Sequence, residues 1–276
     1  MKKQFTLAMA CVAMLFVFSC KNTSTPEPTN DDNTPKKVKV PIKITYSRKL
    51  QPGEPGFGNT VDGYQTTFTT FAYDDKKRLS IRLQQGVETR FTYDANGRVG
   101  GFTTTNGTTL TEATISYEGD LVKTVRSKTY VNGALALDYV YTYNYTGNKL
   151  MEIIHKWDGQ LAATYQFTYT GANPTKMTVR DISNPMDQEF TYDDKKTPYD
   201  NLSAKVALSL PVTPFSLNNV LTRANKLINI ANNTSSATNV YTYDADGFPK
   251  TQVSTSLVSQ SPTPSETRST IEYTEL

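Results

Sequence analysis

The sequence predicts an all-β domain, a long antiparallel meander of about 14–17 strands that curls into a barrel or half-barrel. Three observations predict it: a recurring tyrosine motif, glycine-containing turns between its copies, and alternation of apolar and polar residues between the turns. Alternation with a period of two buries one face of a strand and exposes the other. Closure into a barrel would also remove the exposed strand edges that promote aggregation.

The repeat is an apolar or aromatic residue, any residue, and a tyrosine, often followed by an acid. Successive copies are 20, 24, 26, 26, 23 and 51 residues apart, and the last interval is close to two units. Self-similarity at a fixed period indicates a repeated supersecondary unit, so each unit of roughly 25 residues is predicted to be one hairpin. The motif residues, whose rings are expected in a row across the sheet, are Tyr73, Tyr93, Tyr117, Tyr143, Tyr169, Tyr192 and Tyr243.

Two kinds of turn separate the predicted strands. The segment Asp94-Ala-Asn-Gly97 after a motif tyrosine is typical of a type I turn that ends in a residue at positive φ. Aspartate caps its own backbone there, and glycine adopts the left-handed conformation without a Cβ penalty. Asn-Gly and Asp-Gly pairs halfway through the central units predict two-residue hairpin turns. The turn glycines are Gly97, Gly107, Gly133, Gly147, Gly159 and Gly247.

The alternating strands indicate which face is buried. Large apolar and aromatic residues occupy every second position of 135–145, whereas Glu88, Arg90 and Glu152 lie in the polar phase of their strands. A basic side chain facing lipid at the bilayer midplane costs about 2–4 kcal/mol. The sequence therefore predicts a water-facing outer surface and argues against a membrane-inserted porin.

Residues 197–232 interrupt the repeat. Pro198, Pro211 and Pro214 break the alternation, and residues 217–230 are compatible with either a short helix or a strand. We expect an excursion here that covers one end of the sheet or the mouth of a barrel.

The N-terminus predicts export. Lys2 and Lys3 precede an apolar run over residues 5–18, which is the pattern of a secretory signal. The run has 14 residues, short of the about 20 that a membrane-spanning helix needs. Val17-Phe18-Ser19-Cys20 resembles a bacterial lipobox, so Cys20 is the predicted lipidation site.

The chain is thus predicted to have three parts. Residues 1–19 form the signal peptide, residues 20–37 a lipidated cysteine with a flexible tether, and residues 38–276 the β domain. The tether has no apolar residue other than proline after Cys20 and cannot bury enough surface to fold. Several acyl chains on Cys20 would hold the protein stably on a membrane.

Composition limits the partners. Without residues 1–19, 27 Lys and Arg face 26 Asp and Glu, so the formal charge falls from +3 to +1. This balance argues against nucleic acid, which requires a clustered basic face. The two cysteines are Cys11, in the signal, and Cys20, so the mature domain has no disulfide and no thiolate metal site.

The motif Tyr93-Asp94-Ala95-Asn96-Gly97-Arg98 resembles the YD repeat of secreted Rhs-type and teneurin-type shells. Together with the lipobox, the tether and the degenerate copies, it resembles a family of Gram-negative, Bacteroidota-type lipoproteins of unknown function with a porin-like β fold. The resemblance implies that fold and a lipid-anchored location at the outer membrane, with the leaflet left open. It implies no catalytic residues and no cofactor.

Candidate chemistry is sparse. His155 is the only histidine and has no accompanying serine motif, which argues against a catalytic triad. Asp244 and Asp246 resemble part of a calcium loop but lack the spacing and the final glutamate of an EF-hand. The acidic pairs Asp74-Asp75 and Asp193-Asp194 also fall in the repeat's turns, where aspartate has a structural role. No metal or cofactor is expected.

The function predicted from these observations is a non-catalytic scaffold or binding protein of the cell envelope, with a glycan or an envelope protein as partner. Trp157, beside a predicted turn, is the aromatic residue expected to be exposed for a ligand. The alternative is a polysaccharide-active hydrolase using paired Asp or Glu, which would need two carboxylates about 5–9 Å apart in a cleft.

Overall fold

A computed structural model describes residues 37–276, except for 53, 56–59, 61, 182–183, 203, 210–215, 231–232 and 260. Lys37–Leu276 form one compact unit. The predicted signal peptide, Cys20 and the tether up to residue 36 lie outside the described residues. In the described ranges, no helix has the length and apolar character needed to cross a bilayer.

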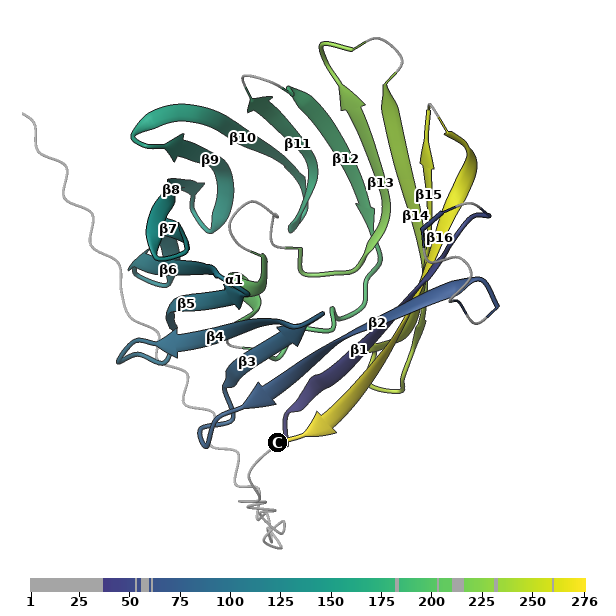
Figure 1. Cartoon of the computed structure of the whole chain (residues 1–276), viewed down its shortest axis with the longest axis horizontal. Coiled ribbons are helices and arrows are strands. Elements are labelled where there is room, and N and C mark those ends of the chain that lie inside the picture. Colours follow the sequence, from purple (N-terminus) through teal and green to yellow (C-terminus); the bar gives the residue numbers. More distant parts are fainter. Residues whose placement is uncertain are drawn as a thin grey trace, which may run out of the picture. The chain divides into compact units, whose positions relative to one another are not determined.

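The unit is a closed antiparallel barrel (Figure 1). Each strand pairs with its sequence neighbours, and β1 closes the ring by pairing with β16. The predicted antiparallel meander is confirmed, and this pairing makes it a barrel rather than a half-barrel. The strands are β1 Lys39–Lys49, β2 Tyr64–Tyr73, β3 Leu79–Gln84, β4 Val87–Tyr93, β5 Val99–Asn106, β6 Thr109–Glu118, β7 Leu121–Val131, β8 Ala134–Thr146, β9 Lys149–Trp157, β10 Gln160–Thr170, β11 Asn173–Asp181, β12 Met186–Tyr192, β13 Val220–Leu227, β14 Thr234–Tyr243, β15 Pro249–Val258 and β16 Ser261–Glu275.

The turn between β4 and β5 shows how the repeat's aspartate works. Asp94 Oδ1 accepts hydrogen bonds of 2.9 Å from the backbone N–H groups of Asn96 and Arg98. The N–H of Gly97 donates to the Asp94 carbonyl at 3.0 Å, with a φ of 78° at Gly97. At the opposite end of the barrel, Asn132 and Gly133 have φ values of 51° and 80°, as a type I′ hairpin requires.

Replacing Gly97 with valine is expected to destabilise the barrel by about 1–2 kcal/mol or more, because a β-branched residue is strained at positive φ. An added Cβ would meet no atom within 4 Å, so the cost comes from the backbone and not from a clash. Chemical denaturation measures the effect, with Gly97→Asn as the control because asparagine tolerates this conformation better. Equal stabilities for Gly97→Val and wild type would contradict the turn geometry.

The motif tyrosines join successive units. The hydroxyl of Tyr93, at the end of β4, donates to the carbonyl of Leu79 near the start of β3, at 2.6 Å. The guanidinium of Arg78, from the turn before β3, lies over the same ring, 4.2 Å from its centre. Tyr93 therefore holds the start of β3 through its hydroxyl and packs its ring on the arginine of the preceding turn. The same hydroxyl-to-carbonyl bond joins Tyr73 to Pro41, Tyr117 to Val99, Tyr169 to Leu150, Tyr192 to Pro174 and Tyr273 to Pro249.

One motif position differs from the prediction. In the units of Tyr93 and Tyr117, the irregularity in strand pairing falls at the motif tyrosine itself. Between β8 and β9 it falls at Asn144/Tyr145, two residues after Tyr143. Tyr145, rather than Tyr143, thus holds the motif position, while Tyr143 is a core residue that is only 1% exposed. Tyr141, Tyr143 and Tyr145 alternate in this strand, so comparison of the repeat copies within the chain could not decide which of them holds the motif position.

The buried phase of the strands faces the interior of the barrel. Buried wall residues such as Phe91, Ile153 and Phe167 form one core cluster with Leu202 and Ala204, which belong to the segment between β12 and β13. Because side chains alternate along a strand, the other phase faces outward. The exposed Arg90 and Arg126 belong to this outward phase.

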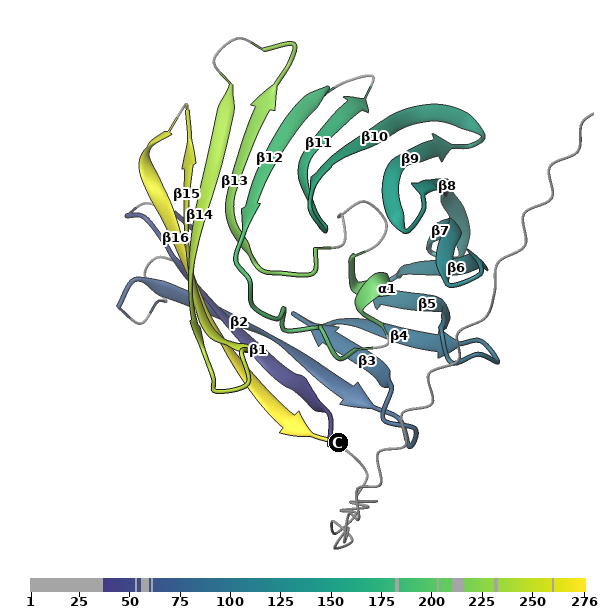
Figure 2. The same cartoon turned by 180° about the vertical axis from the view of Figure 1, so that it is seen from behind.

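The described part of the chain between β12 and β13, residues 193–202, 204–209 and 216–219, is called the lumenal segment. It contains α1 (Lys205–Ser209), which lies within the ring of strands in both views (Figures 1 and 2). The predicted excursion over 197–232 is therefore shorter at its C-terminal side, because residues 220–227 form β13 and pair with β12 and β14. The 51-residue interval is one unit whose turn has been replaced by a long insertion.

Candidate functional site

A cavity of about 550 Å³ lies between the lumenal segment and the inner wall of β12–β15. This is within the range of about 300–1,000 Å³ of small-molecule sites in proteins. Its described lining combines aromatic rings, amides, hydroxyls and two basic side chains. The residues used below are Phe190, Lys205, Asn218, Arg223, Asn239, Tyr241, Gln252 and Ser254.

Hydrogen bonds fix the amides of the cavity wall. The side chain of Asn239 donates to the carbonyl of Val220 at 2.8 Å and accepts from Gln252 at 3.1 Å. Tyr241 also donates to the Val220 carbonyl, at 3.1 Å. Burial raises the pKa of Tyr241 to about 12, so this phenol is neutral at ordinary pH. The wall therefore presents neutral polar groups in fixed positions.

Asp193 and Asn219 hold the two ends of the lumenal segment together. The backbone N–H and side-chain amide of Asn219 donate to the two carboxylate oxygens of Asp193, both at 3.0 Å. The amide also donates to the Lys196 carbonyl at 2.9 Å, and Tyr243 donates its hydroxyl to Asp193. These bonds occupy the Asp193 carboxylate and fix the position of Asn219, which lines the cavity.

The charges at the cavity do not cancel. Lys205 Nζ is 3.9 Å from the carboxylate of Asp200, the one acid that lines the cavity within the described ranges. Arg223 is exposed and pairs with no carboxylate among the described residues. The lining therefore carries a net charge of +1 near Arg223. The hydrolase alternative would use two carboxylates where the described lining has one.

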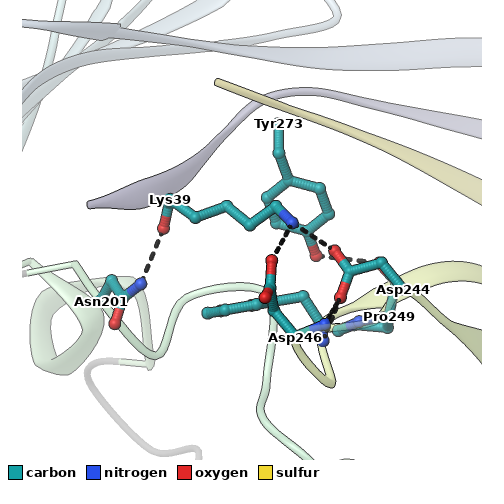
Figure 3. A network of polar contacts seen from close by, with 7 residues as sticks. Lys39, Asn201, Asp244, Asp246, Pro249 and Tyr273 are labelled. Atoms are coloured by element: carbon teal, nitrogen blue, oxygen red, sulfur yellow. Dashed lines mark hydrogen bonds and ion pairs between the residues drawn. The ribbon is translucent and has the colours of Figure 1, made fainter. Parts of the chain in front are cut away.

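The calcium candidates Asp244 and Asp246 lie in the turn between β14 and β15, outside this cavity. The ammonium group of Lys39 is 2.7 Å from a carboxylate oxygen of each (Figure 3). The hydrogen bond to Asp244 is the main cause that raises the pKa of Lys39, so the ammonium stays charged. The side chain of Asn201 donates to the Lys39 carbonyl at 2.9 Å, which ties the lumenal segment to β1.

Among the described residues, no group of three or more His, Cys, Asp or Glu side chains has the arrangement of a metal site. Asp74 Oδ1 accepts hydrogen bonds from the backbone N–H groups of Lys76 and Arg78 at 3.0 and 2.8 Å, which is the capping predicted for the repeat's turn, and Arg78 also pairs with the carboxylate at 2.7 Å. Asp244 caps its turn in the same way, because its Oδ1 accepts from the backbone N–H groups of Asp246 and Phe248, both at 2.9 Å.

Trp157 ends β9 at the rim away from the motif turns and is 50% exposed. It continues a row of rings: His155 stacks on Tyr141 with ring centres 4.4 Å apart, and Tyr139 lies 5.2 Å from His155 and 6.3 Å from Trp157. Burial lowers the pKa of His155, and its buried Nε2 has no hydrogen-bond partner among the residues that the structure describes. His155 is thus a neutral packed ring, and Trp157 is separate from the lining of the cavity.

Sequence reasoning missed the cavity residues. Arg223 lies in residues 217–230, which were compatible with either a helix or a strand. The sequence therefore did not predict which way its side chain points. Asn239, Tyr241 and Gln252 follow the strand alternation like any other inward residues. What distinguishes them is the lumenal segment opposite, whose position no local pattern encodes.

No family model and no curated protein matches the chain in sequence. Among solved structures, the chain is similar to a porin-like protein from Bacteroides uniformis, with a TM-score of 0.56, 13% identity, and coverage of 84% of this chain and 96% of the other. It is also similar to a porin-like protein from Bacteroides vulgatus, with a TM-score of 0.50, 13% identity, and coverage of 86% and 99%. At this identity the likeness shows the fold alone: a porin-like β-barrel.

Proposed function

We propose that the protein is a non-catalytic binding protein of the cell envelope, held on the outer membrane by acyl chains on Cys20. In this proposal the barrel stands in water, and its lumen, rather than a pore, carries the function. The observation that supports it is the polarity of the wall, which is opposite to that of a membrane-spanning barrel.

Charged side chains occur in the outward phase around the barrel. Lys43 lies 3.3 Å from Glu272 across β1 and β16, with both side chains about half exposed. Equivalent outward pairs join Arg126 to Asp138, Lys176 to Asp187 and Arg90 to Glu88. Spanning barrels instead carry an apolar band outside and polar residues inside, and an outward basic residue at the midplane costs about 2–4 kcal/mol. Several such residues argue for a barrel surrounded by water.

The envelope location draws support from the N-terminal pattern and from the porin-like fold. Residue 37, where the described chain begins, lies next to the C-terminus: the N–H of Val38 donates to the carbonyl of Leu276 at 3.2 Å. A tether on Cys20 therefore joins the barrel at the end that carries the motif turns. The rim with Trp157 is the opposite end of the barrel from this attachment, and it is the end proposed to meet a glycan or an envelope protein.

Replacing Cys20 with serine tests the proposal. We expect the variant to leave the membrane fraction and to stay folded in buffer without detergent, because the outer wall needs no lipid. Fractionation with a carbonate wash measures the release, and circular dichroism measures the fold.

The matched control is wild type, which should leave the membrane only with detergent. A Cys20→Ser barrel that has lost residues 1–19 and still resists the carbonate wash would show that the strands span the bilayer. A variant that leaves the membrane but unfolds in buffer would also contradict the proposal.

A further inference from the structure

We propose that the lumenal cavity binds a sugar ring that carries one carboxylate, such as a uronic acid. The inference rests on the proposed binding function and gives it a ligand class. It depends on four features of the cavity: a lone guanidinium, fixed amides, two aromatic side chains, and a volume that fits one or two sugar rings.

Arg223 points into the cavity because of its register on β13. It lies opposite Phe190 on β12 and opposite Ala237 on β14. Both neighbours are buried on the inner side, and directly opposed residues of an antiparallel pair point the same way. The guanidinium is therefore an inward group, although it is exposed to the space inside the barrel.

This guanidinium is available for an anion. It has no carboxylate partner among the described residues, whereas the outward Arg126, Arg90 and Arg268 each have one. Arginine stays protonated at every physiological pH, and its planar fork binds a carboxylate through two parallel hydrogen bonds. The other cation of the lining, Lys205, already faces Asp200. One uncompensated charge matches a ligand with a single carboxylate.

The rest of the lining suits a polyhydroxylated ring. The side chains of Asn218, Gln252 and Ser254 offer donors and acceptors for hydroxyl groups. Tyr241 and Phe190 supply aromatic surface for the apolar C–H face of a sugar. Small-molecule sites commonly combine such apolar walls with a few fixed polar groups.

Titration calorimetry with glucuronate and glucose on the full-length protein in detergent tests the inference. The two probes share the ring and differ in the carboxylate. We expect glucuronate to bind at least about tenfold more tightly than glucose. Arg223→Gln should remove this preference, leaving glucuronate no better than glucose.

Lys226→Gln is the matched control. It removes one positive charge from the same strand, but the residue lies in the opposite, outward phase, so glucuronate affinity should stay unchanged. Arg223→Lys provides a second variant, in which the charge remains without the planar fork, and an intermediate affinity is expected. Circular dichroism verifies that each variant is folded.

Equal binding of the two sugars by wild type would overturn the inference, and so would the absence of binding at about 10 mM of either. Retention of the preference in Arg223→Gln would overturn it as well. None of these outcomes depends on whether the barrel spans the bilayer. Failure of the ligand class is therefore distinguishable from failure of the water-facing barrel.

Discussion

Raising the pH to about 11 is expected to unfold the barrel, because an unusual number of tyrosine hydroxyls are held protonated inside it. Burial raises the pKa of Tyr141 and Tyr145 to about 12, two units above the ordinary value. It raises the pKa still further in other core tyrosines. These are Tyr73, Tyr143, Tyr192, Tyr199 and Tyr273.

The direction of the change in unfolding free energy follows from the number of protons that each state binds. In the unfolded chain these groups lose their protons near pH 10, whereas in the folded chain they keep them to higher pH. Above pH 10 the folded state therefore binds more protons, and the free energy of unfolding falls as the pH rises. At a pH of about 11 each such group costs roughly 0.5–1 kcal/mol after allowance for partial contact with water. Their sum approaches the about 5–15 kcal/mol of a typical domain.

Absorbance of tyrosinate and circular dichroism, recorded together during an alkaline titration, measure this effect. Most tyrosines should ionise in one step that coincides with loss of the β spectrum. In concentrated urea, the control, they should titrate near the ordinary value of about 10. Ionisation of most tyrosines near that value with the β spectrum intact would contradict the buried rings.

Replacing Tyr143 with alanine is expected to cost about 3–5 kcal/mol of unfolding free energy, the range for removing a large aromatic side chain from a core. Tyr143 is 1% exposed and belongs to the core cluster together with Ile153, its partner across β8 and β9. The cavity that the alanine leaves cannot close, because the strands on both sides are fixed in the ring. Urea denaturation followed by tryptophan fluorescence measures the loss.

Thr142→Ala is the matched control. Thr142 neighbours Tyr143 on the same strand but lies in the outward phase, opposite Thr124 and Ile154. Surface changes of this kind usually stay within about 0.5 kcal/mol. Similar losses for the two variants would contradict the burial of the Tyr143 side chain in the core.

Much of the wall could be predicted from local sequence. Asp94 and Gly97 specify their turn through one side-chain cap and one positive φ, and Asn132-Gly133 specifies a hairpin by the same kind of rule. Alternation in 135–145 indicated the inner face of β8 correctly at Tyr141 and Tyr143, which are buried, whereas Leu135 near the rim is 54% exposed. The choice between Tyr143 and Tyr145 was different, because it depends on a bulge that the pairing with β9 places.

The candidate site was much less predictable. Trp157 was expected to be exposed beside a turn, and it is half exposed at a rim. Asp244 and Asp246 were calcium candidates, but Lys39 lies between them from a strand more than 200 residues earlier. No sequence pattern marked Arg223, because its proposed role depends on the lack of a carboxylate partner among the described residues around it.

The sequence by itself determined the turns, the spacing of the hairpins and the alternation of buried and exposed positions, since these depend on interactions within a few residues. Tertiary structure alone decided that the meander closes, that the lumenal segment lies inside the ring, and that a cavity with one uncompensated charge remains between the two. The physical reason is that closure joins β1 to β16, and that the lumenal segment reaches β1 through Asn201 and Lys39 and β2 through Tyr199 and Phe71. Such contacts between distant segments depend on three-dimensional fit, which local patterns do not record.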